Sequence, residues 1–273
     1  MTGAVARIVV LLDAASENHA AIGTAARLAG RWAAHLHGVF VEDDDLIRLA
    51  HLPFARQVTL GAGVEALTLR EAEHQLRVFA ARAREELAAA AQRHGVAWSF
   101  EIVRDGSSDG LSAAPDDFLV ACTATRPIGG HFRVECRWWW NAAASGPSAR
   151  LLAHREGDPY GAVAALIHDR DAAAERLVAA ALRLAEANDA ALAVICPPAL
   201  AQQVGFKTWL DQQLAGHPVA VDIELLRERA PLHRHIAELR CRLVAIHAEA
   251  EEASPDRLRE LIATVACDVL VVR

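Results

Sequence analysis

A run of acidic residues, Glu42 to Asp45, could supply oxygen ligands to a hard cation such as Mg²⁺ or Ca²⁺. It follows an apolar segment over 37–41 that is typical of a buried strand. Open α/β sheets bind their ligands beyond the carboxyl ends of such strands. Consecutive side chains rarely converge on one ion, so the pattern favours a solvated acidic loop. We predict no metal site here.

The 13 histidines and five cysteines suggest a second place for a metal. The densest group is His233, His235, Cys241 and His247, but it lacks the close ligand pairs of a structural zinc site. The cysteines are odd in number and scattered, which argues against a disulfide framework and favours a reducing compartment. The sequence favours surface histidines and no bound metal.

Catalytic motifs are sparse. The sequence contains no H-E-x-x-H and no glycine–lysine phosphate loop. The adjacent pair Asp116 and Asp117 precedes a predicted strand, where capping of a turn is favoured over acid–base chemistry. Whether the protein is an enzyme stays open, and the sequence favours a protein without catalytic activity.

The elements that would position these residues alternate between strand and helix. Strands are predicted at 8–12, 37–41, 98–103, 118–122, 150–154, 163–168, 191–196, 219–226, 243–247 and 269–272. Helices are predicted at 19–35, 64–94, 172–187, 200–214, 232–239 and 255–263. Such alternation implies right-handed crossovers and parallel strands covered on both faces. The predicted fold class is α/β, with two tandem, doubly wound, parallel five-stranded sheets.

The two halves of the chain repeat one pattern. Asp13 and Asp169 each end an apolar run, and each is followed by a capping candidate, Ser16 or Asp171, and an alanine-rich amphipathic helix. The repeat has the length of a domain rather than of a solenoid unit. We predict a first domain over 1–157 and a second over 158–273, joined at a turn rich in glycine.

In order and spacing, these elements resemble the universal stress protein family in its tandem form. The resemblance extends to the valine-rich final strand over 267–273 and to a weaker copy of it over 151–156. It implies a Rossmann-like fold of the adenine nucleotide alpha hydrolase type, with the two units related by a pseudo-twofold axis. It also implies that a nucleotide would lie near the ends of the first two strands, where Asp13, Val39 and Asp169 are candidate contacts.

Nucleotide-binding members of that family hold phosphates with a loop of the form G-x-x-G-x9-G-[ST] after the fourth strand, where glycines admit the backbone close to the anion. In the second half this stretch is 247–254, which contains no glycine and three glutamates. Carboxylates at that place would repel a polyphosphate by about 1 kcal/mol or more. The second half is not predicted to bind ATP.

The first half retains a glycine pair, Gly129 and Gly130, after its fourth strand. Arg126 could hold an anion bidentately nearby. The glycine spacing departs from the family's loop, so an ordinary surface loop is favoured and a remodelled phosphate site stays open.

Two apolar segments could contact a partner protein. Residues 46–55 are too apolar for a plain loop, and they suggest either a lid over the crevice or a contact surface. Residues 138–140 are three consecutive tryptophans, which cannot all point one way, so at least one is expected to face solvent or a partner.

The composition limits the class of protein. The 273 residues are 53% hydrophobic, which is enough to form two apolar cores. The net charge is −7 and the sequence contains no basic stripe, so a nucleic-acid partner is not expected. No apolar run approaches the roughly 20 residues of a membrane helix, and the first residues lack a signal-peptide cleavage site. A soluble cytoplasmic protein without a membrane partner is expected.

The preferred function is that of a non-enzymatic stress-response or regulatory protein without a cofactor, which contacts a protein or small ligand as a monomeric pseudo-dimer or a homodimer. The alternative is an AMP- or ATP-binding protein or slow hydrolase with a divergent site in the first unit, at Asp13, Val39 and the 129–130 loop. A third hypothesis is a metal-binding module that uses the acidic run or the histidines.

Overall fold

The computed structural model describes residues 5–14, 18–42, 44–59, 63–104, 113–122, 148–154, 161–226, 232–265 and 267–273. Among them, no helix combines the length and the apolar character needed to cross a bilayer.

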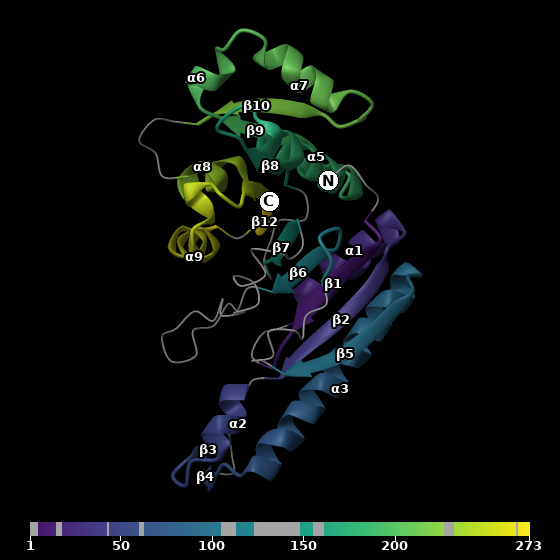
Figure 1. Ribbon diagram of the computed structural model, residues 1–273, viewed down its shortest axis with the longest axis vertical. Helices are drawn as coiled ribbons and strands as arrows, with labels where there is room; N and C mark the ends of the chain where they lie inside the picture. Colours follow the sequence, from purple (N-terminus) through teal and green to yellow (C-terminus); the bar gives the residue numbers. More distant parts are fainter. Residues whose placement is uncertain are drawn as a thin grey trace.

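One ten-stranded sheet runs through the described part of the molecule (Figure 1). Its strand order is β10 (Val221–Leu225), β9 (Leu192–Cys196), β8 (Val163–Leu166), β11 (Leu243–His247), β12 (Asp268–Val272), β7 (Ala149–Ala153), β6 (Phe118–Cys122), β1 (Arg7–Leu12), β2 (His35–Glu42) and β5 (Trp98–Arg104). A separate hairpin pairs β3 (Arg56–Thr59) with β4 (Gly63–Ala66).

The strand order of the first half recurs in the second. Numbered within each half, both sets read 3-2-1-4-5, and all pairings within a set are parallel. The doubly wound α/β fold class is confirmed. The two sets share one sheet rather than forming two, because β12 pairs antiparallel with β7, with Val271 opposite Arg150 and Leu270 opposite Leu151. The domain boundary at 157–158 falls outside the described residues and stays a prediction.

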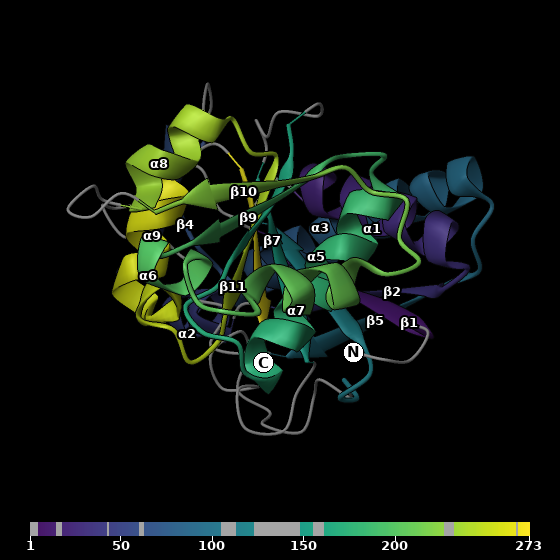
Figure 2. The ribbon, with the colours of Figure 1, turned by 90° about the horizontal axis from the view of Figure 1, so that it is seen from above.

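Helices cover the two faces of the sheet unequally. The first face carries α1 (His19–Trp32), α3 (Leu69–His94), α5 (Ala172–Ala187), α6 (Pro198–Ala201) and α7 (Phe206–Leu214), which share one apolar core. The second face carries α8 (Leu232–Leu239), the 3-10 turn η1 (Glu251–Ala253) and α9 (Pro255–Thr264), all from the second half. Figure 2 shows α8 and α9 on one side of the sheet and α1, α3 and α5 on the other. Among the described residues of the first half, no helix covers the second face.

Small residues let the helices approach the sheet closely. A Cβ built on Gly38 of β2 would lie 2.5 Å from Leu87 Cδ2 of α3, so a larger residue there would force the Leu87 side chain to move. Alanines at positions such as Ala25 and Ala29 of α1 are fully buried against the same face. The alanine-rich composition is therefore used for close helix–sheet packing rather than for large aromatic clusters.

Helix ends follow their capping residues. The α3 helix begins after Thr68, whose hydroxyl accepts a hydrogen bond from the backbone N–H of Glu71, and it ends at Gly95 with φ of 65°. Asp171 is confirmed as a cap because its Oδ1 accepts from the N–H of Ala174 at 2.8 Å. Ser16 lies outside the described residues.

Three predicted helices differ from the observed ones. The helix predicted over 64–94 begins only at Leu69, because residues 63–66 form β4. The helix predicted over 200–214 is divided into α6 and α7 at Gly205, whose φ of 84° is left-handed. The helix predicted over 19–35 ends at Trp32, since Ala33 has φ of 52° and β2 already begins at His35.

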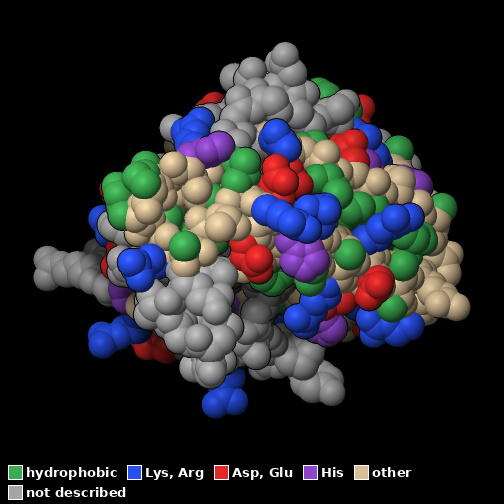
Figure 3. Space-filling model, turned by 90° about the horizontal axis from the view of Figure 1, so that it is seen from below, with side chains coloured by type: hydrophobic (Ala, Val, Ile, Leu, Met, Phe, Trp, Pro, Cys, Tyr) green, Lys and Arg blue, Asp and Glu red, His purple; other side chains and the backbone are tan. Residues whose placement is uncertain are grey.

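The segment after β2 forms an arm that we define as α2 (Asp44–Ala50), residues 51–55 and the β3–β4 hairpin. The arm lies beyond the carboxyl ends of β1 and β2, at the start of α3 (Figure 1). A small core of Ile47, Ala50, Ala55, Leu67 and Ala72 holds it there. Seen from this end, the surface mixes side chains of both charge signs with exposed hydrophobic ones (Figure 3).

Candidate functional site

Asp13 lies where the sequence predicts it, directly after β1. Its backbone N–H donates to Asn18 Oδ1 at 3.2 Å, and Asn18 Nδ2 donates back to the Asp13 carbonyl oxygen at 2.8 Å. This reciprocal pair closes the turn into α1. Strand β1 lies between β2 and β6, where the strand order reverses, which is where doubly wound folds bind ligands.

Val39 lies deeper in the sheet than a strand-end contact. Its side chain is 0% exposed, and its backbone pairs with Leu11 of β1. Three further residues of β2 follow it before the strand ends. The strand ends at Glu42, whose Oε2 accepts a hydrogen bond from Arg104 Nε of β5 at 3.2 Å. The acidic run is therefore paired with a cation at its first position.

Other predicted site residues lie outside the described part of the chain, so their roles stay predictions. They are Arg126, Gly129, Gly130 and the tryptophans at 138–140.

The equivalent edge of the second half is occupied by charged side chains of its own. Asp169 is exposed, and its Oδ1 accepts from the neighbouring backbone N–H of Arg170 at 2.7 Å. Beside it, His168 Nε2 lies 3.4 Å from Glu252 Oε2. The hydrogen bond to Glu252 raises the pKa of His168, and the same bond lowers the pKa of Glu252.

His247 ends β11, the strand whose following loop would carry phosphates in the family pattern. Its Nδ1 accepts from the N–H of Glu249 at 3.3 Å, and its buried Nε2 has no hydrogen-bond partner among the described residues. The chain then turns through η1 into α9, and Glu252 reaches back to His168.

A cavity of about 220 Å³ adjoins this edge, lined by Leu232, His233, Glu251, Glu252, Arg257, Glu260 and Leu261. Arg257 contacts Glu260 at 3.2 Å and Glu251 at 3.6 Å. The carboxylates outnumber the cations among these lining residues. An anionic ligand would have to displace or oppose them, so the cavity is chemically suited to neutral or cationic groups.

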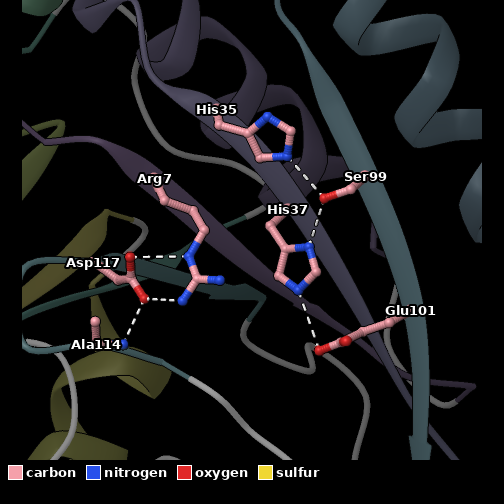
Figure 4. Close-up of polar contacts among 7 residues, drawn as sticks. All are labelled: Arg7, His35, His37, Ser99, Glu101, Ala114 and Asp117. Atoms are coloured by element: carbon pink, nitrogen blue, oxygen red, sulfur yellow. Dashed lines mark hydrogen bonds and ion pairs between the residues drawn. The ribbon is translucent and has the colours of Figure 1, made fainter.

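A polar row crosses β2 and β5 on the second face of the first half (Figure 4). His35 Nε2 and His37 Nδ1 each lie 2.8 Å from Ser99 Oγ, and His37 Nε2 lies 3.1 Å from Glu101 Oε1. If Glu101 accepts from His37 Nε2–H, then His37 Nδ1 accepts the Ser99 hydroxyl, and Ser99 Oγ accepts from His35 Nε2–H. All these bonds can then form with both imidazoles neutral.

Sequence reasoning missed this row, although the alternation of polar residues at 35 and 37 and at 99 and 101 was a usable signal. The order serine, histidine, glutamate is that of a nucleophile, a base and an orienting acid. Here, however, Ser99 is held between two imidazoles on the face of a strand. The row lies on the face of the first half that no described helix covers, and its members satisfy one another's polar groups there.

Arg7 and Asp117 form an ion pair next to the row. Arg7 Nε lies 3.0 Å from Asp117 Oδ1, and Arg7 Nη2 lies 2.5 Å from Oδ2 (Figure 4). Asp117 is 5% exposed, and its Oδ2 also accepts from the N–H of Ala114 at 2.6 Å. The predicted turn-capping role is confirmed for Asp117. The pair raises the pKa of Arg7 through its hydrogen bond to Asp117.

No protein-family model matches the sequence, and no curated protein matches it. Solved structures of similar fold were found. A universal stress protein from Archaeoglobus fulgidus is 11% identical with a TM-score of 0.58, and 97% of this chain and 96% of that chain are covered. A putative universal stress protein from Pseudomonas aeruginosa is 14% identical with a TM-score of 0.60, over 98% and 93% of the two chains.

The cytoplasmic domain of a prokaryotic cation chloride cotransporter is also similar, with 14% identity, a TM-score of 0.52, and 98% and 95% of the two chains covered. The predicted resemblance to the universal stress proteins is thus confirmed for the fold, along the whole chain. Identities this low carry the fold alone.

Proposed function

We propose that the protein is a non-enzymatic stress-response or regulatory protein of tandem universal stress protein type, with units over 1–157 and 158–273. It acts in the cytoplasm without a cofactor, through contact with a protein or small ligand. One observation supports this most directly: Glu252 pairs with His168 in the second unit, where nucleotide-binding members of the family would hold phosphates. The fold is retained while the chemistry of that site has changed.

The arm is the proposed contact surface for a partner protein. Leu49, Leu52 and Phe54 are exposed there by 46%, 42% and 74%. Phe79 of α3, about two helical turns after Ala72 of the small core, is 40% exposed. Apolar side chains gathered on a segment that projects from the domain favour a protein contact over a lid that closes on the strand edge.

The antiparallel pairing of β7 with β12 supports a monomeric pseudo-dimer. Equivalent strands of the two units meet there, as they would across the twofold axis of a dimer. A homodimer of the whole chain stays the second option for the oligomeric state.

Nucleotide binding tests the proposal against its alternative. Purified protein is titrated with AMP, ADP and ATP, with and without Mg²⁺, while the Tm is followed. A ligand that prefers the folded state raises the Tm by mass action. We expect no rise that depends on Asp13. A saturable rise that Asp13→Ala abolishes would overturn the proposal.

That outcome would favour the alternative function, an adenine nucleotide-binding protein or slow hydrolase that uses Asp13, Val39, Arg126, Gly129 and Gly130. The position of Asp13 at the reversal of strand order is the observation in its favour. Asp169 would be the corresponding contact in the second unit.

The partner surface is tested by photocrosslinking in cells. A photoreactive residue at position 54 should give a discrete crosslinked species. The control is position 204, where Val204 is 97% exposed outside the arm. Equal crosslinking at both positions would mean that exposure alone, rather than the arm, determines the contact.

A further inference from the structure

We propose that a cleft between the two halves of the chain binds a multiply charged phosphoryl anion. The cleft has a volume of about 520 Å³, and its lining includes Arg27, Arg31, His94, Asn188, Asp189 and Arg242. Its residues come from both halves. A volume in this range is typical of pockets for small metabolites.

The cleft is separate from the strand-edge sites described above. It lies where α1, α3 and α5 end, and Arg242 directly precedes β11. The cleft therefore opens at the amino ends of the parallel strands, opposite to the edge that carries Asp13 and His168. A ligand bound here would touch neither candidate nucleotide edge.

Arg27 is the central cation of the cleft. Its Nη1 donates to Asn188 Oδ1, a neutral amide oxygen, so this bond does not neutralise the guanidinium. Burial lowers the pKa of Arg27, and the neighbouring charge of Arg242 lowers it further. A partly buried cation beside a second cation is stabilised when an anion binds between them.

The carboxylates near the cleft offset only part of this charge. Asp189 accepts from Arg31 Nη2 at the rim, where the two side chains are exposed by 72% and 53%. Asp268 interacts favourably with Arg27 and Arg242, and burial raises its pKa to about 6, but it does not line the cleft. Among the described lining residues, three arginines therefore face one carboxylate.

Phosphoryl groups fit this arrangement better than carboxylates do. Guanidinium groups present paired N–H donors that match phosphoryl oxygens bidentately, and several arginines can share one multiply charged group. Gly30 lets α1 approach the end of α3 closely beside the cleft, since a Cβ there would lie 3.3 Å from the His94 carbonyl oxygen. The competing explanation is that the arginines only join the halves and interact with the helix carboxyl ends.

Calorimetric titration of the full chain with inorganic triphosphate, at constant ionic strength, separates these explanations. We expect saturable binding that weakens at least tenfold in Arg27→Gln and in Arg242→Gln. The matched control is Arg82→Gln, which removes one positive charge from a side chain that is 76% exposed on α3. Its affinity should equal that of the original protein.

A second variant, Asn188→Asp, guards against loss of folding in the arginine variants. It places a carboxylate against Arg27 and should weaken triphosphate binding while the protein stays folded. Absence of binding, equal weakening in all variants including Arg82→Gln, or citrate binding as tightly as triphosphate would each overturn the proposal. Binding of ATP that Asp13→Ala abolishes and Arg27→Gln leaves unchanged would place the anion at the strand edge instead.

Discussion

His168 Nε2 lies 3.4 Å from Glu252 Oε2, across the gap between the ends of β8 and β11. The two residues follow different strands, so the contact joins the carboxyl ends of two neighbouring strands of the second unit. When His168 is protonated, its positive charge and the Glu252 carboxylate neutralise each other in the region that the family resemblance assigns to a phosphate.

This pair makes stability depend on pH in a defined window. The pKa of His168 is raised, so its contribution is present below the unfolded value near 6.5 and is lost as the pH rises through the folded value. The pKa of Glu252 is lowered, so its contribution is lost as the pH falls below about 4.5. Glu252→Gln should therefore destabilise the protein by about 0.5 kcal/mol at pH 5.5, a small effect because both side chains are partly exposed. The destabilisation should be smaller at pH 8.5, because the contribution of His168 is lost as the pH rises. Urea unfolding at both pH values measures this, and an equal effect at both would contradict it.

His35 predicts the opposite dependence. Burial, with the charges of His37 and Arg7, lowers its pKa, so the folded state favours the neutral ring. Its contribution to stability is present above the unfolded pKa near 6.5 and declines as the pH falls below that value. In His35→Gln, the loss of stability between pH 7.5 and pH 5.5 should be smaller than in the original protein. Chemical unfolding across that range provides the comparison, and parallel pH profiles would rule out this role for His35.

Asp117 and Asp116 are adjacent carboxylates with different roles. Asp117 is buried and bonds both Arg7 and the N–H of Ala114, whereas Asp116 is exposed. Asp117→Ala should lower the free energy of unfolding by about 2–3 kcal/mol, because it removes the buried carboxylate that bonds both Arg7 and the N–H of Ala114. Asp116→Ala, the matched control, should change it by less than about 0.5 kcal/mol. Similar values for the two variants would argue against the buried ion pair as the cause.

Gly38 and Gly23 test the close contact between α3 and the sheet. A Cβ at Gly38 would lie 2.5 Å from Leu87 Cδ2, so Gly38→Ala should destabilise the protein by about 1–3 kcal/mol. A Cβ at Gly23, within α1, meets nothing within 4 Å. Gly23→Ala should stabilise the protein by about 0.5–1 kcal/mol through helix propensity. Thermal unfolding of both variants reports the signs, and stabilisation by Gly38→Ala would show that Leu87 can move aside.

The predicted strands are accurate where a short apolar run is buried on both faces. The ranges 118–122 and 243–247 agree with β6 and β11, because continuous apolar runs of this short length are typical of strands buried on both faces. The end of α3 at Gly95 was also predictable from its residue type. The division at Gly205 had the same kind of signal, but the helical period on both sides of it concealed the break.

Contacts between distant residues could not be predicted from the sequence. The row through Ser99 and the pair of His168 with Glu252 each join side chains more than 60 residues apart, and their register depends on which strands become neighbours. The β3–β4 hairpin was missed because residues 64–66 were assigned to the helix that begins only at Leu69. For the candidate site, strand-end carboxylates such as Asp13 could be located, whereas their bonding partners could not.

The pairing of β7 with β12 has a consequence for synthesis of the chain. Residues 149–153 leave the ribosome more than 100 residues before residues 268–272. One edge of β7 therefore stays unpaired until β12 has been synthesised. An unpaired strand edge is a template for pairing with another nascent chain. The pairing of β7 with β12, which forms last, is therefore also the step at which two nascent chains on one messenger RNA could undergo domain swapping.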